Sequence, residues 1–163
     1  MTAPTSVRRR LVADVGGTNT RVALADGTVL RQGSVTRYRN ADHPGLEDVL
    51  RAFLADNPTE GIDGAAVAVA GPVRDGRAEL TNLDWSIDED MLRRVSSADR
   101  VAVMNDLQAQ GYALGHIATD NQRQLVSANT DGALPTSAKL VIGVGTGFNV
   151  APVYESPGGR FVP

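Results

Sequence analysis

The chain has 163 residues, a formal net charge of −3 and no cysteine. A chain of this length can bury a core unaided, and the lack of cysteine excludes a disulfide framework, a thiolate zinc site and a cysteine nucleophile. The charge balance, 16 basic against 19 acidic residues, argues against nucleic acid and anionic membranes as partners. The sequence contains no recognisable signal peptide or membrane-spanning run, so we expect a cytoplasmic protein.

The first predicted elements are two strands joined by a glycine turn. Arg10 to Val15 and Arg21 to Ala25 are mostly apolar and strand-tolerant, as expected for strands. A third strand, Val29 to Val35, is expected after the turn signal Asp26-Gly27. The chain therefore opens with strands before any helix.

Helices and strands then alternate. Leu46 to Leu54 has apolar residues at helical spacing, which predicts an amphipathic helix. The apolar run Gly64 to Val73 is typical of a strand buried on both faces. The expected elements that follow are an edge strand at Ala78 to Thr81, a helix at Ser86 to Val95, a strand at Val101 to Met104 and a helix from Leu107. Strands at Lys139 to Val144 and Val150 to Tyr154 close the series. This order favours the α/β class, with a mixed sheet covered by helices.

Two glycine-rich turns between strands are candidate phosphate-binding loops. They are "DVGGTNTR", from Asp14, and "GVGTGFN", from Gly143. Glycines allow backbone N–H groups to approach phosphate oxygens, but they also supply positive φ in ordinary hairpins. Two known motifs fail: a mononucleotide P-loop needs a lysine after its glycines, and a dinucleotide turn needs a glycine where Phe148 stands.

Carboxylates follow two of the predicted strands. Asp14 lies just before the first glycines, where it is suited to a magnesium ion that accompanies a triphosphate or to bonds within its own turn. Asp106 follows Asn105 at the end of a strand and the start of a helix. From this segment alone an N-cap is favoured; the functional alternative is a general base for a hydroxyl that attacks phosphorus.

Five segments together resemble those of bacterial glucokinases, members of the sugar kinase, Hsc70 and actin superfamily. In chain order they are "LVADVGGTNTRVALAD", "VAVAGPV", "LTNLDW", "VMNDLQA" and "VIGVGTGFNVAPV". The resemblance implies a ribonuclease H-like (actin-like ATPase) fold with a mixed sheet flanked by helices. It also implies a small N-terminal α/β domain at residues 1–106 and the beginning of a larger second domain at residues 107–163.

The resemblance implies ATP-dependent phosphorylation of glucose to glucose 6-phosphate in glycolysis, with Mg²⁺. Asp106 would be the general base for the 6-hydroxyl, and Asp14 would serve the Mg²⁺ ion through water. Sugar-binding positions would be Asn105, Asp106, Gly71, Pro72 and Asn82. Nucleotide-binding positions would be Asp14, Gly16, Gly17, Thr18 and Asn19 in the first turn and Gly145, Thr146 and Gly147 in the second. Trp85 is more simply a core aromatic. Dimers are common in this family, which leaves a homodimer open for this chain.

The sequence departs from the family in one respect. The sugar-binding Glu-x-x-His motif that follows the second turn is missing, since Glu155 has no histidine three residues later. We therefore expect a portion of a longer polypeptide, in which the rest of the second domain and the closing C-terminal helix are absent here. The alternative is a non-catalytic nucleotide- or sugar-binding half, or a regulator derived from the same fold. The related repressor and kinase family is disfavoured because its cysteine-rich zinc motif is lacking.

Overall fold

The structure is a computed structural model that describes residues 8–80, 83–126, 138–144 and 148–163. The chain divides into two compact units, Met1–Asp106 and Leu107–Pro163. The division falls at the start of helix α3 (Asp106–Ala113). No helix among the described residues is long and apolar enough to cross a membrane.

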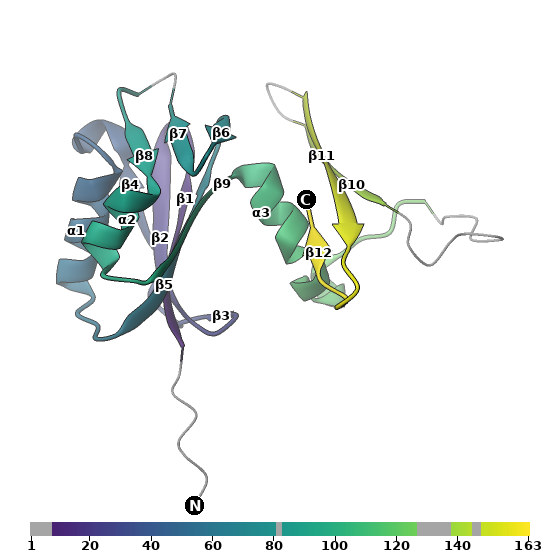
Figure 1. Cartoon of the computed structure of the whole chain (residues 1–163), viewed down its shortest axis with the longest axis horizontal. Helices are drawn as coiled ribbons and strands as arrows, with labels where there is room; N and C mark the ends of the chain where they lie inside the picture. Colours follow the sequence, from purple (N-terminus) through teal and green to yellow (C-terminus); the bar gives the residue numbers. More distant parts are fainter. Residues whose placement is uncertain (1–7, 81–82, 127–137, 145–147) are drawn as a thin grey trace, which may run out of the picture. The chain divides into compact units, whose positions relative to one another are not determined.

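The first unit is built on a six-stranded mixed sheet (Figure 1). Its strands are β1 (Arg9–Val15), β2 (Asn19–Asp26), β3 (Val29–Leu30), β4 (Thr36–Arg39), β5 (Ile62–Val69) and β9 (Arg100–Asn105). Their order is β3-β2-β1-β5-β9, and β4 also pairs with β2. β1 runs antiparallel to β2 but parallel to β5, which is parallel to β9. The predicted mixed α/β sheet is confirmed.

Two helices, α1 (Leu46–Asp56) and α2 (Glu89–Ser96), cover one face of this sheet (Figure 1). α1 buries Leu46, Val49, Leu50 and Phe53, the spacing of one helical face, and the prediction of this helix is confirmed. These side chains meet strand residues such as Val15 and Val67 in one core cluster. Full burial of such a side chain is worth about 1.5–3 kcal/mol, so this face stabilises the unit.

The other face of β5 is less buried than we predicted. Ala65, Val67 and Val69 are buried, whereas Ala66 and Ala68 between them are only partly buried. The prediction of a strand buried on both faces is therefore wrong. The predicted strand is also too long: β5 ends at Val69, and a separate short strand resumes at Val73. The break contains Pro72, which has no N–H for a sheet ladder.

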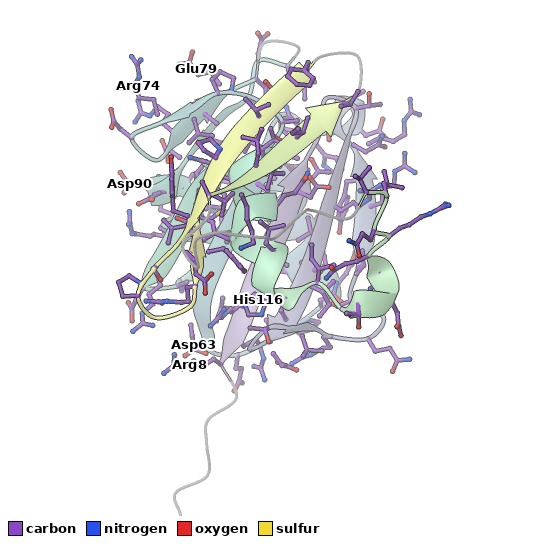
Figure 2. All side chains as sticks on the ribbon, turned by 90° about the vertical axis from the view of Figure 1, so that its right-hand side faces the viewer. Arg8, Asp63, Arg74, Glu79, Asp90 and His116 are labelled. Carbon is purple, nitrogen blue, oxygen red and sulfur yellow. The ribbon has the colours of Figure 1, made fainter. Side chains whose placement is uncertain are left out.

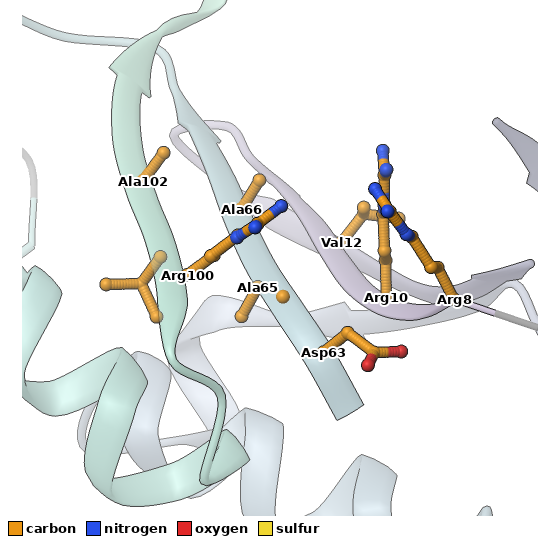
Figure 3. Close-up of a pocket in the computed structure, with 10 residues that line it drawn as sticks. Arg8, Arg10, Val12, Asp63, Ala65, Ala66, Arg100 and Ala102 are labelled. Carbon is orange, nitrogen blue, oxygen red and sulfur yellow. The ribbon is translucent and has the colours of Figure 1, made fainter. Parts of the chain in front are cut away.

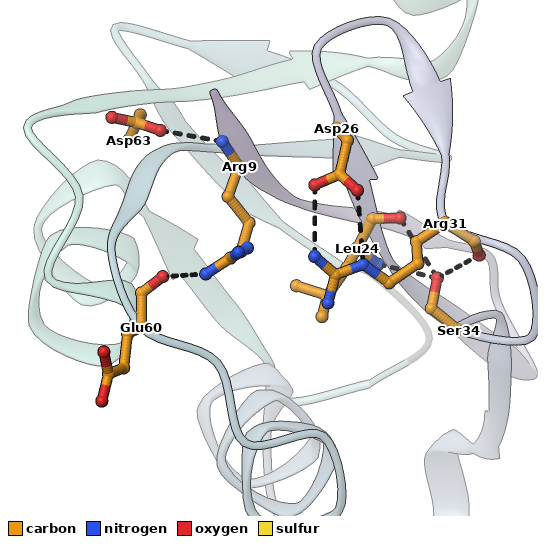
Figure 4. A network of polar contacts seen from close by, with 7 residues as sticks. All are labelled: Arg9, Leu24, Asp26, Arg31, Ser34, Glu60 and Asp63. Atoms are coloured by element: carbon orange, nitrogen blue, oxygen red, sulfur yellow. Dashed lines mark hydrogen bonds and ion pairs between the residues drawn. The ribbon is translucent and has the colours of Figure 1, made fainter. Parts of the chain in front are cut away.

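The predicted third strand is wrong as a single element. β3 pairs with β2 at Ala25 and Asp26, and β4 pairs with β2 from Asn19 to Val22. Between these two pairings the Ser34 hydroxyl accepts a hydrogen bond from Leu24 N at 3.2 Å and lies 3.1 Å from Leu24 O (Figure 4). A buried hydroxyl thus takes the place of a backbone acceptor for Leu24 N, while Leu24 O accepts from Arg31 N at 2.8 Å. Gly33, at φ +76°, turns the chain between the two short strands.

A small second sheet follows β5. It comprises β6 (Val73–Arg74), β7 (Arg77–Glu79) and β8 (Ser86–Asp88). The predicted helix at Ser86 to Val95 therefore begins later than expected, because its first residues form β8. Asp88 is the N-cap, and its Oδ1 accepts a hydrogen bond from Met91 N at 2.7 Å. Trp85 is 5% exposed, which confirms its interpretation as a core residue.

The second unit is a helix with a β-hairpin. Helix α3 leads into a 3-10 turn at Leu114–His116, and β10 (Lys139–Val144) pairs antiparallel with β11 (Phe148–Glu155), which pairs with β12 (Phe161–Val162). At Gly111 of α3 a Cβ atom would lie 3.0 Å from Val153, so glycine permits close packing of α3 on β11. Further 3-10 turns span Asn40–Asp42 in the first unit and Thr119–Asn121 in the second.

Candidate active site

The carboxyl ends of three parallel strands bring the predicted residues of the first unit to one edge of the sheet. Val15 of β1 is in register with Val69 of β5, and Val69 with Asn105 of β9. The first glycine turn, the Gly71-Pro72 segment and the Asn105-Asp106 pair each follow one of these strands. A hydrogen bond from Ala70 N to Val15 O, 2.9 Å long, links two of the three. Ligands of open α/β sheets bind at this kind of edge.

The first glycine turn is shaped by space and not by positive φ. Neither Gly16 nor Gly17 has a positive φ, although five other described glycines do. Gly16 N donates to Asn19 O at 3.0 Å, and a Cβ atom at Gly16 would lie only 3.3 Å from that oxygen. Gly17 and Thr18 are exposed. The structure therefore does not support the ordinary-hairpin explanation for these two glycines, and the turn offers bare backbone to solvent.

Asp14 lies beside this turn with its carboxylate accessible. Its Oδ2 is 3.3 Å from Arg21 Nη1, and the two side chains are 56% and 63% exposed. An ion pair this exposed is worth little, so it does not prevent the carboxylate from taking another partner. Among the described residues, no group of three or more His, Asp or Glu side chains is arranged so that it could hold a metal ion. A single carboxylate fits Mg²⁺ held mainly by phosphates and water.

On β9, Asn105 is tied to the segment that follows β5. Its Nδ2 donates to Gly71 O at 2.9 Å, which orients the side-chain amide and joins two of the predicted sugar-binding positions. Asn105 and the adjoining Asp106 are both partly buried. Asp106 is the first residue of α3. At Gly71 a Cβ atom would meet its neighbours at 3.9 Å, an ordinary contact, so this glycine is not required by space.

Four predicted site residues lie outside the described residues. They are Asn82 on the sugar side and Gly145, Thr146 and Gly147 in the second turn. The two strands that bracket the second turn are described, and Val144 of β10 pairs with Phe148 of β11. The strands predicted on either side of this turn are therefore confirmed.

Asn40 is a site residue that the sequence did not reveal. It follows β4 and is 1% exposed, and it forms hydrogen bonds with three alternate residues of the first turn and β2: Gly16, Thr18 and Thr20. An asparagine in a polar segment gives no local signal of such a role. Only the pairing of β4 with β2 brings it to the turn.

A cavity of about 280 Å³ lies at the opposite edge of the same sheet (Figure 3). It is lined by Arg8, Arg10 and Arg100 above small residues such as Ala66. Figure 2 shows Arg8 at one end of the sheet and Arg74, which follows β5, at the other. None of the predicted site residues lines this cavity, so it is separate from the candidate site.

The comparison with solved structures shows the class of fold to which the chain belongs. A glucokinase from an Antarctic psychrotroph matches with a TM-score of 0.79 at 28% identity, covering 94% of this chain and 49% of that one. A glucokinase of Balamuthia mandrillaris in complex with glucose matches with a TM-score of 0.71 at 23% identity, covering 99% and 49%, which shows the fold alone. The chain has the actin-like ATPase fold of the sugar kinases.

The sequence comparisons then show the family. The sequence model of the glucokinase family matches residues 11–163, and the chain belongs to the glucokinase family. Glucokinase of Caulobacter vibrioides is 39% identical over 153 residues, 91% of this chain but 44% of that protein. Glucokinase of Ralstonia nicotianae is 34% identical over 157 residues, 94% of this chain and 45% of that protein. The chain spans less than half the length of these relatives.

Proposed function

We propose that the complete protein containing this chain is a glucokinase that transfers the γ-phosphoryl group of ATP to O6 of glucose. The observation that carries this proposal is the arrangement at the carboxyl edge of the sheet, where the first glycine turn and the Asn105-Asp106 pair follow strands in common register. The turn follows β1 and the proposed base follows β9, two strands of one sheet that flank β5. A nucleotide turn and a carboxylate base at the same edge of a sheet suit phosphoryl transfer to a hydroxyl. Membership of the glucokinase family supports the same reaction.

Asp106 is the proposed general base. Its carboxylate takes the proton from the 6-hydroxyl as the O6–P bond forms and the bond from the γ-phosphorus to ADP breaks. The products are glucose 6-phosphate and ADP, and the proton rests on Asp106 until solvent removes it. β9 ends at Asn105 and α3 begins at Asp106, so the carboxylate follows directly on a strand of the main sheet.

The sugar is proposed to lie against Asn105, Gly71, Pro72 and Asn82. The hydrogen bond from Asn105 Nδ2 to Gly71 O, 2.9 Å long, supports a shared surface for the first two. With its amide orientation set, Asn105 is suited to discriminate hydroxyl groups. Hydrogen-bonding sites of this kind reject analogues that lack the matching hydroxyl.

The nucleotide is proposed to be held by the first turn, Asp14 with Gly16 to Asn19, and by Gly145 to Gly147 in the second. The backbone N–H group of Gly17 suits a phosphate oxygen, since this residue is exposed and carries no side chain. Asp14 is the residue that would hold Mg²⁺ through water. When bound, that ion neutralises charge developing on the phosphates.

A sugar panel tests this function. The complete gene product is assayed with ATP and glucose, mannose, fructose or glucosamine, and ADP release is followed by a coupled reaction. We expect glucose to give the highest kcat/KM and its product to be glucose 6-phosphate. Absence of phosphorylation of every sugar, by a protein shown to be folded, would contradict the proposal.

A second candidate function rests on the missing Glu-x-x-His motif and on the 44% coverage of the Caulobacter relative. A chain ending at residue 163 in the cell would be a nucleotide- or sugar-binding module without turnover. The intact mass of the native protein distinguishes these two candidate functions.

We propose the cytoplasm as the location of the complete protein, since the reaction draws on ATP there. We also propose a homodimer as its assembly, which equilibrium sedimentation tests.

A further inference from the structure

We infer that Asn40 is a positioning residue that holds the first glycine turn ready for a nucleotide phosphate. The inference rests on the proposed function, because it assigns the turn to ATP. Asn40 lies outside the turn, at the start of the 3-10 segment Asn40–Asp42 that follows β4. It reaches the turn because β4 pairs with β2, with Asn19 opposite Arg39.

Three hydrogen bonds connect Asn40 to this region. Asn40 Nδ2 donates to Gly16 O at 2.8 Å, and Asn40 N donates to Thr18 O at 2.9 Å. Thr20 Oγ1 donates to Asn40 Oδ1, also at 2.8 Å. Asn40 and Thr20 are 1% and 0% exposed. Because water does not compete at these positions, the contacts define one arrangement of the turn.

These bonds determine which way the turn's donors face. In a trans peptide the C=O and the following N–H point in opposite directions. Asn40 holds Gly16 O inward, so the N–H of Gly17 faces away from Asn40 and toward the exposed side of the turn. Donors fixed in advance bind an anion without the entropic cost of ordering them first. Asn40 therefore acts on the nucleotide through the backbone and touches neither substrate.

The proposal separates Asn40 from an ordinary buried polar residue. Ser34 is the matched comparison, since it is 4% exposed and its hydroxyl is within hydrogen-bond distance of Leu24 N, Leu24 O and Arg31 O. Ser34 thus braces the same strand β2, but beside Leu24 and away from the turn. Both residues contribute to stability, and only Asn40 should affect the nucleotide.

The test uses three variants of the complete gene product. We expect Asn40→Ala to raise KM for ATP about tenfold, the effect of losing one buried hydrogen-bonding group, with KM for glucose within about twofold. Asn40→Ala and Ser34→Ala should lower the thermal midpoint of unfolding by similar amounts. Ser34→Ala should leave KM for ATP unchanged. Thr20→Val, which keeps the Asn40–Gly16 bond but removes one anchor of the amide, should give a smaller rise, about threefold.

Unchanged KM for ATP in Asn40→Ala, or an equal rise in Ser34→Ala, would overturn the inference. If Asn40→Ala does not fold, Thr20→Val decides, and an unchanged KM for ATP in that variant is also contradictory. If the wild-type protein phosphorylates no sugar, the proposed function fails separately. Calorimetric titration of Mg·ATP into wild-type and variant proteins then decides on Asn40: a Kd weakened about tenfold supports it, and an equal Kd or no binding refutes it.

Discussion

The strands that flank the two glycine turns differ strongly in how far their apolar side chains are buried. The first turn joins β1 and β2, whose inward side chains lie in a core cluster with α1 and α2. The second turn joins β10 and β11, where several large apolar side chains are exposed: Leu140, Ile142, Val144, Phe148 and Val150. Large exposed apolar surfaces mark sites that another segment or chain covers. The strands around the first turn are thus packed into a core of described residues. The strands around the second turn leave large apolar side chains exposed.

Truncation of a phenylalanine in the 163-residue chain should give the largest contrast between the core around the first turn and the hairpin around the second. Phe53 of α1 is fully buried, whereas Phe148 of β11 is 69% exposed. We expect Phe53→Ala to lower the free energy of unfolding by about 3–5 kcal/mol and Phe148→Ala to change it by less than about 0.5 kcal/mol. Urea unfolding measures both costs when it is followed by fluorescence of Trp85, the single tryptophan, for the first unit and by circular dichroism for the whole chain. Equal costs would break the comparison.

Hydrogen exchange should show the same contrast without mutation. β5 is hydrogen-bonded on both sides, to β1 and β9, whereas β10 pairs only with β11 among the strands that the structure describes. Amides of β5 should therefore exchange at least about 100-fold more slowly than those of β10, as expected for a core strand against an edge strand. Mass spectrometry on peptides from Ile62–Val69 and Lys139–Val144 measures the ratio. Similar rates would show that the hairpin is as firmly held as the core.

A smaller effect is expected at the N-cap of α2, which sharpens the account of the first unit. Asp88→Ala removes the acceptor of Met91 N and should cost about 1 kcal/mol in the same unfolding experiment. Asp88→Asn keeps a capping oxygen and should cost much less. A loss of equal size in both variants would point to the charge of Asp88, and not to the cap.

The smallest expected effect concerns pH. Hydrogen bonds from Arg51, and then from Arg94, lower the pKa of Glu47 on the surface of α1. A lowered pKa in the folded state means that the associated stability is present above the ordinary glutamate pKa and is lost as pH falls through the folded value. Carbon-13 NMR titration should place Glu47 below an ordinary glutamate, and Arg51→Ala should move it back. An unmoved pKa in that variant would contradict the assignment.

The sequence was most informative where local pattern and tertiary contact agree. The helical spacing of Leu46, Val49, Leu50 and Phe53 predicts α1, and a mostly apolar run predicts β1. The prediction of strand bounds failed where one buried polar side chain determines the course of the backbone. Ser34 divides the expected third strand through its contacts with Leu24, and this contact depends on β2, ten residues away.

The candidate site was predictable to a similar degree. The Asn105-Asp106 pair and the first turn could be predicted because they follow apolar strands, and their common register then comes from parallel pairing. Asn40 could not be predicted from the sequence, because the role proposed for it depends on the pairing of β4 with β2. The roles of all these residues, and those of Asn82 and of Gly145 to Gly147, stay predictions.

The most direct test of the account is Asp106→Asn in the complete gene product. The change keeps the size of the side chain and one accepting oxygen but removes the proposed base, so we expect kcat with glucose and ATP to fall by at least about 100-fold. Glucose Kd, measured by calorimetry, should stay within about threefold, a difference of less than 1 kcal/mol. Asp90→Asn, the same change at an exposed position of α2, should leave both unchanged. Retained turnover in Asp106→Asn would contradict the assignment of the base.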